Sequence, residues 1–150
     1  MILYLDTSAL VKLILQEEGT AAATAWFEQA DLSASSVVTY AEACAALGQN
    51  DRQRGKAPSR LGEWLIALDE HWQEVFRLPV AEWPAGRLAL SHKLRGMDAV
   101  QLAAALTLRE RLRAGTPDSS SRDVAFAAFD RRLLEAAERE GFATLGAPLE

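Results

Sequence analysis

Four acidic residues each stand where an apolar, strand-like run of the sequence gives way to a helix-like one: Asp6, Glu42, Asp98 and Asp130. In an open α/β sheet, ligands bind outside the carboxyl ends of the strands, so we expect these carboxylates to meet in one cleft. Four carboxylates in one cleft repel one another unless cations lie between them. Hard divalent ions such as Mg²⁺ bind such oxygen atoms and usually bring substrate phosphates with them. The pattern therefore predicts a metal-dependent phosphodiesterase.

Each of these acids, taken alone, also fits the role of a helix cap. Asp accepts hydrogen bonds from the free N–H groups of a helix N-terminus, and the helix dipole favours negative charge there. Thr39 and Glu42 have the spacing of a capping box, with Thr39 as the cap. Asp98 and Asp130 fit cap positions as well. Their shared placement at one sheet edge nevertheless favours a metal site, and capping does not exclude metal binding.

Strand-like and helix-like segments alternate along the chain, which predicts a parallel sheet with helices on both faces. The expected strands span residues 2–6, 32–36, 75–80, 124–129 and 142–145. The expected helices span residues 8–15, 20–30, 39–53, 60–73, 83–94, 98–112 and 131–140. Pro79 indicates that the third strand ends there or lies at the sheet edge. Ser59 is the expected cap of its helix, and residues 115–121 are expected to form a flexible loop.

The length and charge of the chain limit its function. Its 150 residues, 49% of them hydrophobic, predict one soluble globular domain spanning residues 1–150. The formal charge of −5 argues against nonspecific binding to a long phosphate backbone, which requires many Lys and Arg contacts. Removing the four candidate ligands from this count leaves −1. A nucleic-acid enzyme with local basic patches is therefore still allowed.

Nothing in the sequence directs the protein to a membrane or out of the cytoplasm. Asp6 and Lys12 interrupt the apolar run 1–15, no basic segment precedes it, and no small-residue cleavage site follows it. The run is therefore expected to be a buried strand and helix. Cys44, the single cysteine, cannot form an internal disulfide, and we expect it to pack as a small hydrophobic residue.

Four segments resemble the acidic motifs of PIN-domain ribonucleases, and most closely those of the VapC toxins of bacterial and archaeal toxin–antitoxin pairs. The segments are Leu5–Lys12, Thr39–Glu42, Leu94–Ala103 and Phe129–Leu133. The first and third motifs are specific, whereas the second and fourth are weaker signals. The resemblance extends over essentially the whole chain, with the motifs in the same order and at suitable spacing.

The resemblance implies an α/β/α sandwich with a mostly parallel sheet of four to five strands. It also implies an endoribonuclease that depends on one or two Mg²⁺ or Mn²⁺ ions. By position in the motifs, the acidic cluster would consist of Asp6, Glu42, Asp98 and Asp130. Thr7 or Ser8 would supply a hydroxyl group near the metal or its waters. The implied partners are RNA, a VapB-like antitoxin and a second copy of the chain.

The chain departs from the family pattern at two positions. Many members have a hydroxyl residue where this chain has Ala128, which affects the positioning of Asp130. Many have histidine where this chain has Gln101, a position that varies in the family. Four basic residues lie near the motifs and are candidates for contacts with RNA phosphates: Lys12, Arg95, Arg131 and Arg132.

Other chemically versatile residues are assigned structural roles. His71 and His92 lie on helices remote from the acidic motifs, so we expect them at the surface or in helix packing. The four tryptophans could stack on RNA bases, but their helical placement favours packing in the core or in a subunit interface. They are Trp26, Trp64, Trp72 and Trp83.

Three alternatives to a toxin follow from the same residues. A PIN nuclease for RNA maturation would have the same motifs. A phosphatase of the haloacid dehalogenase type, with Asp6 as phosphate acceptor, requires a second Asp two residues later, where this chain has Ser8. A binding module without activity is disfavoured because all four acids are present.

Overall fold

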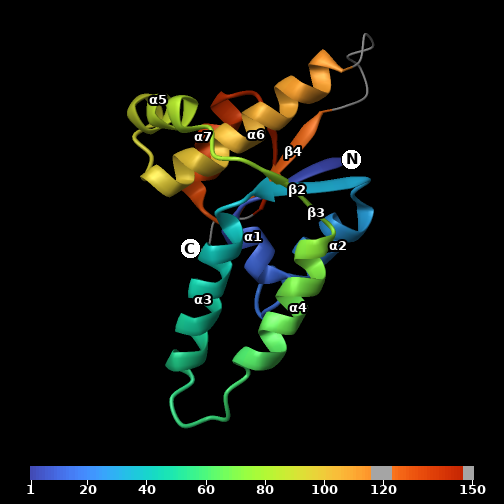
Figure 1. Ribbon diagram of the computed structural model, residues 1–150, viewed down its shortest axis with the longest axis vertical. Helices are drawn as coiled ribbons and strands as arrows, with labels where there is room; N and C mark the ends of the chain where they lie inside the picture. Colours follow the sequence, from blue (N-terminus) through green and yellow to red (C-terminus); the bar gives the residue numbers. More distant parts are fainter. Residues whose placement is uncertain (116–122, 147–150) are drawn as a thin grey trace.

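The computed structural model, which describes residues 1–115 and 123–146, is built around a five-stranded parallel sheet. The strand order is β3-β2-β1-β4-β5, so β1 lies at the centre (Figure 1). The strands are β1 (Ile2–Leu5), β2 (Leu32–Ser36), β3 (Val75–Leu78), β4 (Val124–Ala127) and β5 (Ala143–Leu145). The prediction of a mostly parallel sheet of four to five strands is confirmed.

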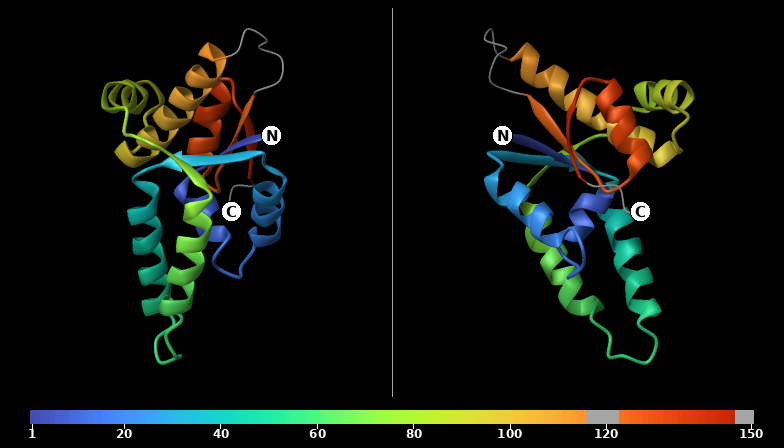
Figure 2. Two further views of the ribbon diagram at one scale, coloured as in Figure 1. Left: turned by 45° about the vertical axis from the view of Figure 1, so that its right-hand side comes forward. Right: turned by 180° about the vertical axis from the view of Figure 1, so that it is seen from behind.

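Helices cover both faces of this sheet, which gives the three layers that the sequence predicts (Figures 1 and 2). Helices α1 (Thr7–Lys12), α2 (Thr20–Gln29), α3 (Thr39–Gln53) and α4 (Leu61–Gln73) belong to one face. Helices α5 (Glu82–His92), α6 (Gly96–Ala114) and α7 (Arg131–Arg139) belong to the other. No helix in residues 1–115 and 123–146 combines the length and the apolar character needed to cross a bilayer.

Alternation of side chains along the central strands creates two separate cores. In β1, Leu3 and Leu5 pack with the α1–α4 layer, whereas Tyr4 packs with the α5–α7 layer. All three are fully buried. Because β1 is buried on both faces, it reads as a continuous apolar run, and Asp6 is the residue at which that run ends.

Several boundaries differ from the predicted ones. Helix α1 ends at Lys12 instead of residue 15, although residues 13–15 are buried as expected. Helix α4 has Arg60 as its N-cap instead of Ser59, whose hydroxyl donates to Asp51 and accepts a long bond of 3.3 Å from the Leu61 N–H. Strand β3 ends at Leu78 and forms an edge of the sheet, as Pro79 indicates. The expected loop at 115–121 lies, apart from its first residue, outside the described residues.

Helices α3 and α4 form a hairpin that projects away from the sheet (Figures 1 and 2). Trp64 is only 7% exposed within the core on this side, so the prediction of core packing is confirmed for this residue. The guanidinium groups of Arg54 and Arg60 lie over its ring, 5.9 and 5.6 Å from the centroid. Trp72, nearer the sheet, contacts the ring of Tyr40.

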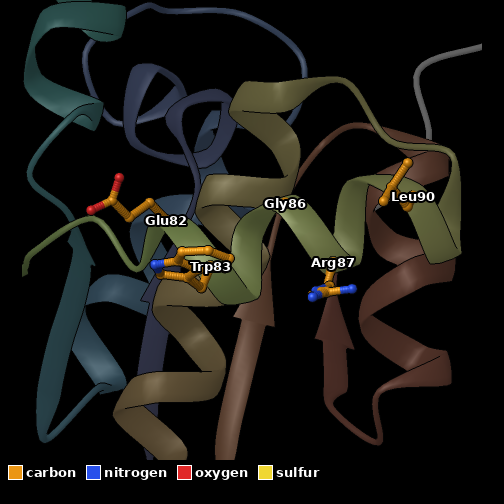
Figure 3. A pocket seen from close by; sticks show the side chains of 5 residues that line it. All are labelled: Glu82, Trp83, Gly86, Arg87 and Leu90. Carbon is orange, nitrogen blue, oxygen red and sulfur yellow. The ribbon is translucent and has the colours of Figure 1, made fainter.

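Trp83 does not pack in the core but is 78% exposed on α5, so packing in a subunit interface stays a prediction for this residue. The buried face of this helix is formed by Ala85 and Leu88, and Trp83 lies outside it. Trp83 and Leu90, the latter also 78% exposed, line a shallow surface pocket of ≈ 350 Å³ with Gly86 between them (Figure 3).

Candidate active site

Asp6 is held firmly at the carboxyl end of the central strand. It is the N-cap of α1, and its Oδ1 accepts hydrogen bonds from the Ala9 N–H at 2.9 Å and the Ser8 hydroxyl at 2.7 Å. Its own backbone N–H donates to the carbonyl of Ala127 on β4. The side chain is only 5% exposed. Strand pairing and helix capping therefore fix this carboxylate together.

Ser8 connects Asp6 to the fourth acidic motif. Besides donating to Asp6, its hydroxyl accepts a hydrogen bond of 2.8 Å from the backbone N–H of Phe129. The next residue, Asp130, caps α7 through a 2.9 Å bond from the Leu133 N–H. The capping interpretation is therefore confirmed for Asp130, and capping places this acid beside the first motif.

The capping interpretation is wrong for Thr39 and its box. Helix α3 begins at Thr39 with Val38 as N-cap, and no side chain in the described structure caps it. Thr39 is fully buried and its hydroxyl binds inside the fold instead. The Glu42 carboxylate accepts hydrogen bonds from the Thr7 hydroxyl at 2.8 Å and from the Gln101 amide at 3.0 Å. Glu42 is thus oriented by tertiary contacts and not by its own helix.

Asp98 is not a cap either. Helix α6 begins two residues earlier, at Gly96, and Arg95 occupies the N-cap position. Asp98 therefore lies in the first turn, where the helix dipole favours a negative charge. Within the described residues, no side chain forms a cap bond at this helix end.

Gln101 lies at the centre of a buried polar network that sequence reasoning missed. It is 2% exposed, and its amide nitrogen lies 2.9 Å from the Thr39 hydroxyl and 3.0 Å from Glu42. Its carbonyl oxygen accepts a 2.7 Å bond from the Tyr4 hydroxyl. One feature of the sequence could have revealed this network: Gln101 is a polar residue that lies one helical turn after Asp98 in an otherwise apolar stretch.

All four acids line one cavity of ≈ 350 Å³. The same cavity is lined by Thr7, Ser8, Lys12, Glu17, Gln101 and Phe129. Residues from four separate motifs thus meet where the strands end and the helices begin. Both hydroxyl residues hold acids in place: Thr7 donates to Glu42, and Ser8 donates to Asp6.

The cavity is a poor environment for negative charge. The pKa of Asp6 is raised to about 7, chiefly by burial and additionally by the nearby Asp98 and Asp130 carboxylates, against the opposing hydrogen bonds from Ser8 and Ala9. The pKa of Asp98 is also raised, first by burial and then by Asp130. A cation in the cavity would relieve both effects.

Comparison with known proteins identifies this architecture. The family model described as "PIN domain" matches residues 3–139. The chain belongs to the PIN-domain family. Ribonuclease VapC45 of Mycobacterium tuberculosis is 34% identical over 152 aligned residues, which cover 99% of this chain and 98% of that protein.

Solved structures with lower sequence identity share the PIN fold. The crystal structure of PAE2754 from Pyrobaculum aerophilum aligns with a TM-score of 0.66 at 18% identity, covering 97% of this chain and 83% of that one. VapBC2 from Rickettsia felis, solved bound to a DNA fragment from its promoter, aligns with a TM-score of 0.61 at 11% identity. That alignment covers 98% of this chain and 99% of the other.

The donor set of this PIN domain fits a hard divalent cation by its chemistry, because the cavity offers carboxylate oxygens and neutral hydroxyl groups. In the part of the chain that the structure describes, no three His, Cys, Asp or Glu side chains stand close enough to hold an ion. An ion bound directly by three of these carboxylates would require them to move toward a common centre, whereas one held by one or two carboxylates and water would not.

The four basic residues singled out in the sequence separate into two places. Lys12 lines the acidic cavity, is 5% exposed, and forms a 3.0 Å salt bridge with Glu17. Its ammonium also lies 5.2 Å from the ring centroid of Phe129. Arg95, Arg131 and Arg132 line a different, adjoining cavity.

The raised pKa of Asp6 predicts a pH-dependent penalty in the metal-free protein. Since its pKa is about 7 in the folded state, against an ordinary 3.8, the folded state holds the proton more tightly. The contribution of Asp6 to the free energy of unfolding therefore falls as the pH rises from 4 through 7. We expect Asp6→Asn, which keeps the cap oxygen, to be about 1 to 3 kcal/mol more stable than wild type at pH 8.

Urea unfolding in EDTA at pH 5 and pH 8 measures this difference, which should shrink at pH 5. Asp31→Asn is the control, because the amino terminus lowers the pKa of this exposed acid and its removal should bring no gain at pH 8. An Asp6→Asn protein with no stability gain at pH 8 would contradict the assigned electrostatics.

The buried network predicts a large cost for removing the Gln101 amide. In Gln101→Leu, Tyr4, Thr39 and Glu42 each lose a hydrogen-bond partner inside the fold. We expect the free energy of unfolding to fall by about 1 to 3 kcal/mol or more. The same substitution at exposed Gln53 should change it by less than about 0.5 kcal/mol. Equal effects in the two variants, measured by urea unfolding, would show that the network contributes little.

Proposed function

We propose that this PIN domain is a metal-dependent endoribonuclease that acts as the toxin of a toxin–antitoxin pair. The observation that carries the proposal is the convergence of four acids from four separate segments in one cavity: Asp6, Glu42, Asp98 and Asp130. Similarity to Ribonuclease VapC45 along nearly the whole of both chains supports RNA as the substrate.

In this proposal, Asp6 and Asp98 are the central metal ligands, and Glu42 and Asp130 bind directly or through water. One or two bound Mg²⁺ or Mn²⁺ ions would lower the pKa of a bound water and offset charge on the leaving oxygen. A carboxylate that does not bind an ion directly accepts the proton of the attacking water. Thr7 and Ser8 act as positioning residues, since each donates its hydroxyl proton to one of the acids.

Proton transfer in this proposal does not use histidine. His92 forms a 2.6 Å contact with Glu140, and His71 packs against the Phe27 ring and forms a 2.8 Å hydrogen bond with the Ala67 carbonyl. Among the described residues that line the cavity, there is no histidine. The carboxylates are therefore the groups available to accept a proton there.

The proposal predicts that single ligand substitutions abolish cleavage without unfolding the protein. Asp6→Asn and Asp98→Asn each remove an anionic ligand and also relieve the repulsion between carboxylates. We expect RNA cleavage with Mg²⁺ or Mn²⁺ to fall by more than about 100-fold, beyond the loss typical of groups that only support a ligand. Asp31→Asn should retain wild-type activity. Full activity of either ligand variant would refute the assignment, and a wild type inactive with Mn²⁺ would favour a binding module.

The antitoxin partner is also proposed. We propose a VapB-like antitoxin for this chain, supported by the fold it shares with VapBC2 of Rickettsia felis. A basic side chain of such a partner would form strong charge-assisted bonds with the acidic cavity. We further propose a cytoplasmic location. A homodimer stays a prediction, for which the exposed Trp83 and Leu90 on α5 offer apolar surface (Figure 3).

Co-expression tests the toxin role. We expect expression of this chain alone to arrest growth, and both Asp98→Asn and co-expression with the product of the adjacent upstream gene to relieve the arrest. Purification should then yield a stable complex with suppressed ribonuclease activity. If expression of an active enzyme is harmless and no neighbouring product binds, a role in RNA maturation replaces the toxin role.

A further inference from the structure

A second cavity of ≈ 300 Å³ adjoins the acidic one and has the opposite character. The two cavities share Asp98, Phe129 and Asp130 as common lining residues. The remaining wall contains four cations, which we call the basic lobe: Lys93, Arg95, Arg131 and Arg132. Lys93 was not among the residues that the sequence suggested.

The fold holds the basic lobe in place through a constrained turn and a helix start. Lys93 ends α5 in a left-handed conformation with φ 53°, which is uncommon for a residue with a side chain. The following Leu94 is buried in the core, and its N–H binds the carbonyl of Ala89. Arg131 and Arg132 are the first two residues of α7, directly after the Asp130 cap. The cations therefore project from anchored backbone.

The charge of the basic lobe is largely unused within the protein. Lys93, Arg95 and Arg132 are exposed, and none of their side chains forms a hydrogen bond or salt bridge within residues 1–115 and 123–146, although the charge of Arg95 lowers the pKa of the neighbouring Asp98. Arg131 forms only a 2.9 Å salt bridge with Glu135 on the surface of its own helix. The chain has a net charge of −5, so four cations around one cavity make this part of the surface unusually positive.

We propose that the basic lobe binds an RNA phosphate that neighbours the phosphate to be cut, so that one strand spans both cavities. This inference rests on the proposed function and deepens it. A polyanion suits the four cations of the lobe, and one that binds there lies next to the acidic cavity, because Asp98 and Asp130 line both. Arginine side chains suit phosphate, which they bind through two parallel hydrogen bonds.

A division of roles follows between the two cavities. The acidic cavity alone repels RNA, since its lining carboxylates and the RNA phosphates are both negatively charged. The basic lobe offsets that repulsion through a phosphate that does not react. Substitutions in the lobe should therefore raise KM and Kd for RNA while leaving kcat near the wild-type value, whereas a substitution of a ligand acid lowers kcat.

The first test measures binding of a short single-stranded oligoribonucleotide in EDTA, where no cleavage occurs, over a range of salt concentrations. Arg95→Gln and Arg132→Gln remove exposed cations of the lobe, and Arg87→Gln on α5 is the matched control, since it lies in a separate pocket. We expect each lobe variant to bind several-fold more weakly. The slope of log K against log salt should also fall by about 0.7 per lost phosphate contact. Arg87→Gln should leave both quantities unchanged.

The second test replaces single phosphates of a cleaved oligonucleotide with neutral methylphosphonate linkages, one position at a time. A neutral linkage at one position beside the cut should weaken binding of the oligonucleotide to wild type. The same linkage should cause no further loss of affinity in Arg95→Gln or Arg132→Gln. Purely additive losses at every position would overturn the inference, as would equal losses in Arg87→Gln.

These outcomes are separable from failure of the proposed function. If wild type cleaves RNA and the lobe variants keep its KM and Kd, the lobe inference fails and the nuclease assignment stands. If wild type neither binds nor cleaves RNA with Mn²⁺, the proposed function itself fails. If the lobe variants bind RNA normally but no longer bind the co-expressed partner, the lobe belongs to a protein interface and the inference is overturned.

Discussion

The burial of one carboxylate, Asp6, beside other acids is the constraint on which the organisation of this protein depends. Asp6 is almost fully buried, and Asp98 and Asp130 both oppose its ionisation. The fold nevertheless keeps it in place, because Asp6 pairs through its backbone with β4 and caps α1 at the same time. A stable sheet and two buried cores compensate for a site that is unfavourable by itself. The buried acid lowers the free energy of unfolding locally, as is expected at a functional site.

Neutral groups make this arrangement rigid without adding charge. Gln101 binds the Tyr4 hydroxyl on one side and Glu42 on the other, and burial keeps the pKa of Tyr4 well above its ordinary value. A charged residue in the place of Gln101 would add to the electrostatic problem or neutralise an acid. An amide avoids both effects, since it donates and accepts without titrating.

The sheet, the layers and the convergence of the acids could be predicted from the sequence, because apolar runs that end in polar residues mark the ends of buried strands. Local rules failed where tertiary contacts decided the outcome. Thr39 has the type and spacing of a cap, yet its hydroxyl is used inside the fold. Trp83 lies on a helix as predicted, but α5 buries Ala85 and Leu88 and leaves Trp83 outside its buried face. Lys93 could not be assigned because only the turn between α5 and α6 brings it beside α7.

The position of β1 at the centre of the sheet determines when the cavity can form during synthesis. Ile2 on β1 pairs with Leu32 on β2, but on the other side its partner is Val124 on β4. The ribosome must therefore translate most of the described chain before β1 has both neighbours and Asp130 can approach Asp6. Contacts of such large sequence separation slow folding, because closing a long loop costs conformational entropy. A nascent chain that stalls or ends before β4 and α7 therefore lacks the assembled acidic cavity. The cavity can form only after both elements have been synthesised.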